Sequence, residues 1–145
     1  MVKIEKLNTP KLDINQQVLD KLMRSLEKLE ASTDLEGTAI VSKTGLRVAS
    51  SETADIAADI YSASPATLIS LGEKISMGLE QGELQEIVIR GTNGYTIIVV
   101  GSKDNNFMLF TNCKKGYKLG YYFHKIRKAF RIMEPLLKQI EKQRK

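Results

Sequence analysis

Apolar residues follow two periodicities along the chain, and together these predict three helices and five strands. The first helical segment begins near Asp13, a capping residue with Gln16 three positions later, and ends near residues 32–34, where short polar side chains compete for backbone groups. Its apolar positions recur every three or four residues, so one stripe of the helix faces a core. This stripe consists of Ile14, Val18, Leu22, Leu26 and Leu29.

Residues 35–50 predict a β-hairpin. Two runs rich in Thr, Ala, Ile and Val flank the turn Lys43-Thr44-Gly45, and a glycine-containing turn between strand formers is the usual signal for two antiparallel strands. A helical pattern precedes this hairpin and another follows it. The full order is helix, hairpin, helix, three strands and helix, which is typical of a sheet that carries helices.

The second helical segment, residues 53–81, contains Pro65, which is unfavourable in a helix interior. Either a kinked helix begins near residue 54, or a short turn over residues 54–61 leads into a new helix at Pro65, capped by Ser64. Gly82 is placed to end the helix. The later half has one apolar stripe and three small residues that would let another backbone come close. The stripe is Leu68, Leu71, Ile75 and Leu79, and the small residues are Gly72, Ser76 and Gly78.

Three strands are predicted after this helix, at residues 83–90, 95–101 and 106–112, with turn-rich segments between them. The middle strand contains the continuous apolar run TIIVV, which is typical of a strand that is covered on both faces. Helices should therefore lie on both sides of the sheet. The first of the three strands is also apolar, and at a sheet edge it would favour aggregation unless a second chain paired with it.

The last helix is predicted to begin near Lys118, and Pro135 should bend it or cut it short. Its apolar residues alternate at four- and three-residue steps, which is the period of an amphipathic helix. They are Leu119, Phe123, Ile126, Phe130, Met133, Leu137 and Ile140.

The length of 145 residues, with 42% apolar residues and 3 prolines, predicts a single domain over residues 13–145 and a loose arm over residues 1–12. The only cysteine, Cys113, has no partner for an internal disulfide, which favours a reducing compartment, and we expect the cytoplasm. No apolar run has the length of a membrane span, and the N-terminal residues lack the pattern of a signal peptide.

The net charge of +5 is unevenly distributed along the chain. Residues 113–145 carry 11 basic and 2 acidic side chains, whereas residues 1–112 carry 11 basic and 15 acidic ones. A solvated helix face with a charged tail accounts for this pattern, and an anionic partner would also fit it. The basic residues that could form such a patch are Lys114, Lys115, Lys118, Lys125, Arg127, Lys128 and Arg131. Tyr117, Tyr121 and Tyr122 lie between them and would suit either stacking on bases or, more commonly, packing.

The residues that most enzymes need are absent or poorly placed. The only histidine, His124, lies in the last helix beside apolar positions, and no cluster has the spacing of metal ligands. Residues 37–44 nearly match a phosphate-binding loop, but Ser42 replaces the second glycine and the intervening residues are strand formers. We therefore expect no enzyme activity, no metal and no cofactor.

This order of patterns resembles the roadblock family, which includes the dynein light chain roadblock and many prokaryotic regulators of small GTPases. The resemblance covers residues 14–140, and Pro65 departs from the family pattern. It implies an α+β, profilin-like fold, in which a five-stranded antiparallel sheet carries the middle helix on one face and the two terminal helices on the other. It also implies dimers in which the middle helices meet and the third strands pair. The residues that carry it are residues 35–42, Gly45-Leu46, Gly72-Glu73-Lys74, the strands up to Asn112, and Leu119-Gly120.

We therefore predict a symmetric dimer, because the apolar strand needs a partner and the small helix residues allow close approach. The expected interface consists of Leu68, Leu71, Gly72, Ile75, Ser76, Leu79, Leu84, Glu86, Ile87, Val88 and Ile89. The resemblance implies a non-enzymatic scaffold that binds a Ras-like small GTPase and controls its nucleotide state, like a GTPase-activating protein, or its localisation; it also allows a heterodimer with another roadblock protein. The alternative is an adaptor that docks on an anionic membrane or, less favoured, nucleic acid through the basic last helix.

Overall fold

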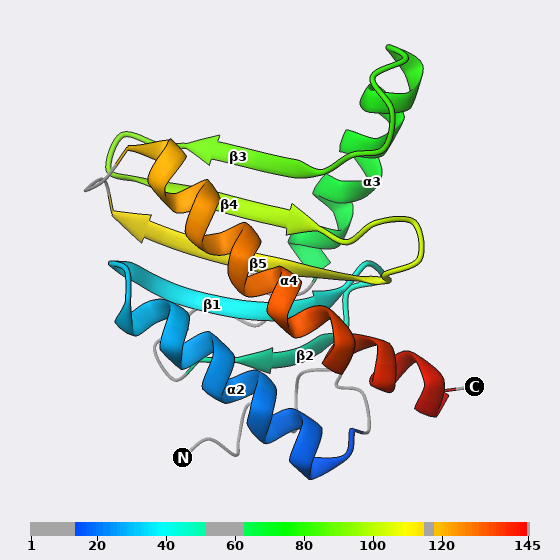
Figure 1. The fold of residues 1–145 in the computed structure, drawn as a ribbon. Helices are drawn as coiled ribbons and strands as arrows, with labels where there is room; N and C mark the ends of the chain where they lie inside the picture. Colours follow the sequence, from blue (N-terminus) through cyan, green and yellow to red (C-terminus); the bar gives the residue numbers. More distant parts are fainter. Residues whose placement is uncertain (1–13, 52–62, 115–117, 145) are drawn as a thin grey trace.

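The computed structural model describes residues 14–51, 63–114 and 118–144, and the side chains up to residue 141. It contains three helices and five strands among these residues, in the predicted order (Figure 1). The predicted loose arm, the turn over residues 54–61, Asp13, Lys115 and Tyr117 lie outside the described residues. The elements are α2 (Gln16–Ala31), β1 (Leu35–Ser42), β2 (Arg47–Ser50), α3 (Ala63–Gly78), β3 (Glu86–Arg90), β4 (Gly94–Val100), β5 (Phe107–Lys114) and α4 (Leu119–Arg144).

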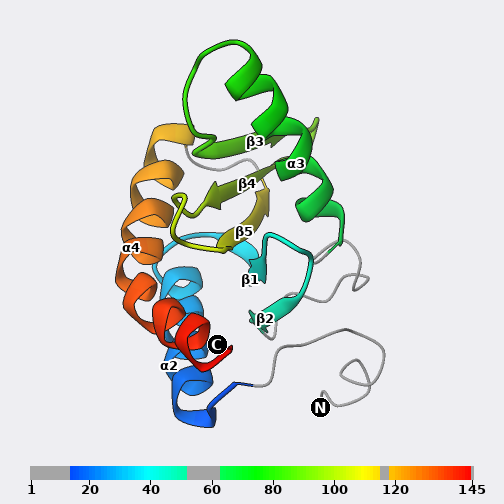
Figure 2. The ribbon, with the colours of Figure 1, turned by 90° about the vertical axis from the view of Figure 1, so that its right-hand side faces the viewer.

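The five strands form one sheet in the order β2-β1-β5-β4-β3, and every neighbouring pair is antiparallel. Helices α2 and α4 cover one face and α3 covers the other (Figure 2). Successive residues of β4 contribute to opposite cores: Ile97 packs on the α2 and α4 side, and Ile98 packs on the α3 side. The predictions of an α+β fold and of helices on both faces are therefore confirmed.

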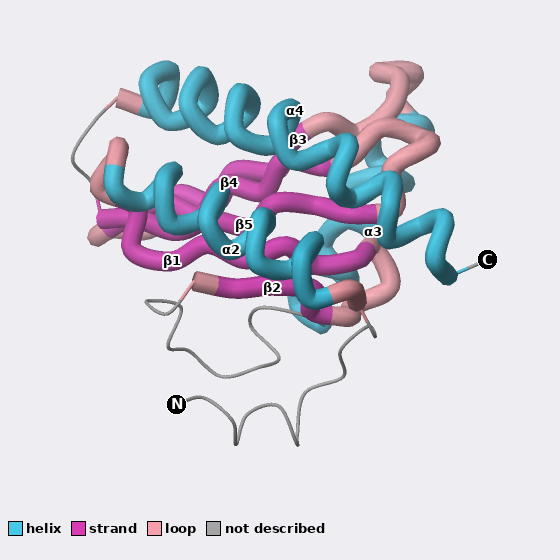
Figure 3. The backbone as a smooth tube through the Cα atoms, turned by 60° about the horizontal axis from the view of Figure 1, so that its bottom comes forward, coloured by secondary structure: helices cyan, strands magenta, loops and turns pink. Residues whose placement is uncertain are grey.

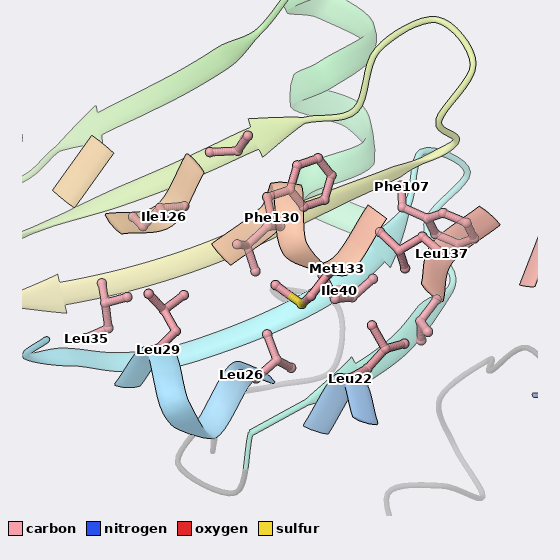
Figure 4. Packing of buried hydrophobic residues seen from close by; sticks show 14 of the residues in the cluster. Leu22, Leu26, Leu29, Leu35, Ile40, Phe107, Ile126, Phe130, Met133 and Leu137 are labelled. Atoms are coloured by element: carbon pink, nitrogen blue, oxygen red, sulfur yellow. The ribbon is translucent and has the colours of Figure 1, made fainter. Parts of the chain in front are cut away.

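Helices α2 and α4 run next to each other across the same face of the sheet (Figure 3). Their apolar stripes interdigitate with the side chains of the strands below them (Figure 4). Each fully buried aliphatic side chain contributes roughly 1.5–3 kcal/mol, so this cluster is the main source of stability. Its buried members include Leu22, Leu26, Leu29, Leu35, Ile40, Phe107, Ile126, Phe130, Met133 and Leu137.

The N-terminal end of α2 is capped by Asn15. The Asn15 side-chain oxygen accepts hydrogen bonds from the backbone N–H groups of Gln17 at 2.8 Å and Val18 at 3.4 Å. This arrangement satisfies two donors that the first turn of a helix leaves without partners. Asn15, and not the predicted Asp13, therefore immediately precedes the described helix, which ends at Ala31, one residue before the predicted region.

The hairpin β1–β2 forms as predicted. The Ser42 N–H donates to the Leu46 carbonyl at 2.8 Å, and the Gly45 N–H donates to the Ser42 carbonyl at 3.0 Å. Gly45 has a φ of 97°, which residues with a Cβ rarely adopt, so this turn position requires glycine.

Helix α3 is described from Ala63, the first residue after a gap in the described residues, so the choice between a kinked helix from residue 54 and a new start at Pro65 lies outside them. Ser64 lies within Ala63–Gly78, so its predicted role as a cap is wrong. The helix ends four residues before Gly82. Glu80, with a φ of 57°, closes the end of the helix, and the Gln81 N–H donates to the Ser76 carbonyl at 2.8 Å. Gly82 is also left-handed, with a φ of 90°.

Helix α4 continues through Pro135 to Arg144, so the proline does not cut it short. Tyr122 is fully buried in the same helix and belongs to the large core, although the predicted apolar stripe passed through its neighbour Phe123, which is only partly buried. Strand β3 begins at Glu86, three residues later than predicted.

Candidate protein interaction surface

Strand β3 forms one edge of the sheet. It pairs with β4 alone, and its other side faces away from the sheet (Figure 1). Val88 is 38% exposed and Ile89 is 44% exposed. An exposed apolar edge is a template for pairing with another chain, because the N–H and C=O groups on its outer side lack partners within the sheet.

Helix α3 adds further apolar side chains next to this edge. Leu71, Ile75 and Leu79 of the predicted stripe are 53%, 61% and 64% exposed, whereas Leu68 packs against the smaller core. Met77 is also 61% exposed, and the stripe pattern missed it because it lies two positions from Ile75. We call these exposed residues the α3–β3 surface; it consists of Leu71, Ile75, Met77, Leu79, Val88 and Ile89.

The other predicted interface residues of α3 and β3 face their own chain. A Cβ at Gly72 would lie 3.0 Å from Leu84 Cδ2 and 3.4 Å from Ile87 Cδ1, so the small residue lets α3 lie close to the segment before β3 and to β3 itself. Ser76 is buried and donates a 2.6 Å hydrogen bond to the Gly82 carbonyl. Gly72 and Ser76 therefore serve packing within the protomer, and their predicted role at a dimer interface stays a prediction.

Glu86 is held by α4 on the opposite face of the sheet. The Arg127 Nη2 group donates to Glu86 Oε1 at 2.6 Å, and its Nε group donates to Glu86 Oε2. Hydrogen bonding to Glu86 raises the pKa of Arg127, and the guanidinium lies over the Phe123 ring with 4.8 Å between Cζ and the ring centroid. Arg127 is thus an anchor between α4 and the edge strand.

Some members of the predicted basic patch contact other side chains of the protein, and others do not. Lys114 Nζ lies 3.7 Å from a Glu36 carboxylate oxygen, and Lys125 Nζ lies 5.8 Å from the centroid of the Tyr121 ring. The patch members on α4 that form neither a described ion pair nor a described contact with a ring are Lys128 and Arg131. Tyr122 is fully buried, so it cannot stack on bases, and this part of the nucleic-acid hypothesis is wrong.

The segment that nearly matches a phosphate-binding loop is a strand. Residues 37–42 belong to β1 and pair with β5, so their backbone N–H groups cannot wrap around a phosphate. The Lys43 ammonium donates to the carbonyls of Gly101 at 3.0 Å and Ser102 at 3.3 Å. Lys43 therefore fixes the loop between β4 and β5.

Among the described residues, the remaining side chains that could act in catalysis or metal binding do not form a common site. His124 is exposed on α4, and Cys113 is buried, which raises the pKa of its thiol. Within the described ranges, no three His, Cys, Asp or Glu side chains are placed to hold a metal ion. None of the described helices has the length and apolar character needed to cross a membrane.

Comparison with known families identifies the class of this fold. A sequence model of the Roadblock/LC7 domain matches residues 22–110, and the chain therefore belongs to the roadblock/LC7 family. The comparison with curated proteins finds no match.

Solved structures with the same fold include three structures of MglB. An MglB with a tetrameric arrangement has a TM-score of 0.79 at 14% identity, over 90% of this chain and 98% of that one. Myxococcus xanthus MglB has a TM-score of 0.77 at 14% identity, over 89% and 96% of the two chains. The gliding protein MglB of Thermus thermophilus has a TM-score of 0.71 at 15% identity, over 92% and 98%. At these identities the likeness shows the fold.

Proposed function

We propose that the protein is a dimeric, non-enzymatic platform that binds a Ras-like small GTPase in the cytoplasm. The observation that carries the proposal is the α3–β3 surface, where a free sheet edge and exposed apolar side chains lie together. Exposed apolar side chains beside a free sheet edge are typical of a contact with another protein. A second copy of the chain is the partner that would cover it symmetrically.

Membership in the roadblock/LC7 family supports a regulator of a small GTPase as the role of this dimer. Catalysis would remain with the GTPase, and the platform would act by binding one nucleotide state more tightly than the other. The dimer would thereby control the nucleotide state or the localisation of its partner.

A binding experiment tests this role. Ras-like GTPases from the same genome are loaded with GDP or with a non-hydrolysable GTP analogue, and each is titrated with the protein. We expect at least one GTPase to bind, with affinities that differ between the two nucleotide states. If no GTPase binds in a state-dependent way, the proposed role is wrong, whatever the oligomeric state.

A second candidate is an adaptor that docks on an anionic membrane through α4. Its support is that Lys128 and Arg131 are both exposed and that α4 has no acidic residue before Glu134. Binding to vesicles that contain phosphatidylserine, with a steep decrease as salt concentration rises, would favour this candidate. Equally strong binding to neutral vesicles would contradict this candidate.

A further inference from the structure

The sequence of the free edge is self-complementary. Strand β3 reads Glu86-Ile87-Val88-Ile89-Arg90, with an acidic residue at one end, a basic residue at the other and three apolar residues between them. Arg90 is exposed and forms no described ion pair. If an antiparallel copy is centred on Val88, each charge meets its opposite and each isoleucine meets an isoleucine.

The backbone of β3 restricts how a copy can pair with it. The Val100 N–H donates to the Gln85 carbonyl and the Gly91 N–H donates to the Gly94 carbonyl, both at 2.9 Å. Odd-numbered residues of β3 therefore direct their backbone groups toward β4, and the even-numbered Glu86, Val88 and Arg90 direct theirs toward the free edge. A symmetric antiparallel copy must pair even-numbered residues with even-numbered ones, because only these present free donors and acceptors.

We propose that two copies pair through β3 in one register, with Val88 opposite the partner's Val88 and Glu86 opposite the partner's Arg90. This inference rests on the proposed dimer and adds its register and its specificity-determining charges. The Glu86 carboxylate, already bound by Arg127 of its own chain, would accept the partner's Arg90 as a second cation. Each interface would contain two such charge clusters, one on each side of the twofold axis.

Neighbouring registers lack this complementarity. A pairing centred on Ile87 places Arg90 opposite the partner's Leu84, and a pairing centred on Ile89 places Glu86 opposite the partner's Thr92. Both leave an edge charge without its counter-charge. Because opposite charges stabilise a directly opposed pair and like charges destabilise it, the Val88-centred register is favoured.

The position of α3 supports the same pairing. The helix extends past β3 on the face opposite α4 (Figures 1 and 2). Gly72 lies over Ile87, and Ile75 is almost one turn further along the helix. In the proposed register the partner's Ile89 lies directly opposite Ile87. The exposed end of α3, with Ile75 and Leu79, would therefore cover an isoleucine that is 44% exposed in the single chain.

The register also implies a homodimer. A strand whose pattern matches its own reverse pairs best with an identical strand, whereas a heterodimer would need a partner strand with the same charge order. The Glu86 and Arg90 positions thus determine the choice between a second copy and another roadblock protein.

Cysteine cross-linking tests the register directly. In a Cys113→Ala background, which removes the only native cysteine, Val88→Cys, Ile87→Cys and Ile89→Cys are prepared and oxidised. Directly opposed residues of a hydrogen-bonded pair have Cα atoms about 5.5 Å apart, within disulfide range, whereas residues offset by two positions lie about 7–8 Å apart. We expect a disulfide dimer from Val88→Cys and little from the other two.

The other outcomes separate this inference from the proposed dimer. Cross-linking that is strongest for Ile87→Cys or Ile89→Cys would overturn the register and leave the dimer intact. A dimer in sedimentation without cross-linking of any variant would also overturn the register. A monomer at micromolar concentration in sedimentation would overturn the dimer itself.

Charge reversal provides a second test. Arg90→Glu should raise the dimer dissociation constant about tenfold, because two opposite-charge pairs become like-charge pairs. A second variant, Glu86→Arg with Arg127→Glu, keeps an ion pair between positions 86 and 127 of one chain. Its homodimer should be weakened by a similar factor, because Arg90 would then face a second arginine. Mixing the two variants should restore both interface pairs and give a heterodimer. Arg24→Glu, an exposed reversal on α2, is the matched control and should change nothing. If Arg90→Glu dimerises as tightly as Arg24→Glu, the register is wrong.

Discussion

Tyr122 illustrates how the role of a single residue depends on its surroundings. It lies among lysines and tyrosines in the sequence, yet its side chain is fully buried between α4 and the sheet. The hydroxyl donates to Asp34 Oδ1 at 2.6 Å, so it joins α4 to the segment that follows α2. An aromatic ring with one polar atom is well suited to this position, because the ring fills the core and the hydroxyl reaches its edge.

Two substitutions separate these contributions. Tyr122→Phe should lower the free energy of unfolding by about 1 kcal/mol, because it removes one hydrogen bond and keeps the ring. Tyr122→Ala should lower it by about 3–5 kcal/mol, because it leaves a cavity. Denaturation in urea measures both. Equal losses in the two variants would show that the hydroxyl, and not the ring, dominates.

Cys113 should make stability depend on pH in the alkaline range. Burial raises the pKa of its thiol above the ordinary value of 9.0, so the folded state binds the proton more tightly than the unfolded state does. The stabilising contribution is complete below pH 9.0 and is lost as the pH rises through the pKa of the folded state.

The prediction for Cys113→Ala follows from this sign. The difference in unfolding free energy between the parent and Cys113→Ala should be constant below about pH 9. Above that pH the parent should become less stable relative to Cys113→Ala, by at most about 1.4 kcal/mol per pH unit. Urea titrations of both proteins between pH 7 and pH 10 measure it. A difference that stays constant over the whole range would contradict the prediction.

At the scale of elements, two glycines of α3 differ in how closely other segments of the chain approach them. A Cβ at Gly72 would meet Leu84 and Ile87, whereas a Cβ at Gly78 would meet no atom within 4 Å. The first glycine sets the distance between α3 and β3, and the second does not contribute to packing. Because α3 and β3 together carry the proposed interaction surface, Gly72 also sets the shape of that surface.

The same replacement at both positions tests this difference. Gly72→Leu should destabilise the protein by roughly 1–3 kcal/mol, because it forces α3 away from the neighbouring segments. Gly78→Leu should be neutral or stabilise it by up to about 1 kcal/mol, because leucine is the better helix former. Thermal denaturation shows which of the two variants is the more stable. A Gly72→Leu protein as stable as Gly78→Leu would show that the close approach at Gly72 is unimportant.

At the scale of the whole molecule, the sheet has helices on both faces but a free edge at β3. The α3–β3 surface gathers exposed apolar side chains at this edge, and Ile132 on α4 is also an exposed apolar residue, at 62%. Ile75 and Ile132 provide a matched comparison, because their exposures are nearly equal and only Ile75 belongs to the proposed interface.

Ile75→Glu should therefore shift the protein toward monomer by at least about tenfold in dissociation constant, because a charge would be buried at the interface. Ile132→Glu should leave the dimer unchanged. Analytical ultracentrifugation over a concentration series measures both. Weakening of the dimer by Ile132→Glu alone would place the interface on α4 instead.

The sequence by itself determined the order of the elements, the two covered faces of the sheet and the apolar character of β3. These properties are local, since the period of the apolar residues shows which sides of an element are buried. The hairpin turn was equally readable, because the φ of 97° at Gly45 requires a residue without a side chain.

Only the tertiary structure decided which neighbours these residues meet. Arg127, a member of the predicted basic patch, binds Glu86, 41 positions away. Gly72, a member of the predicted dimer interface, lies against Leu84 and Ile87 of its own chain. Helical periodicity gives the direction of a side chain around its axis, but the element it meets depends on how distant segments pack. The chemistry of the edge therefore became visible only when β3, α3 and α4 were placed together.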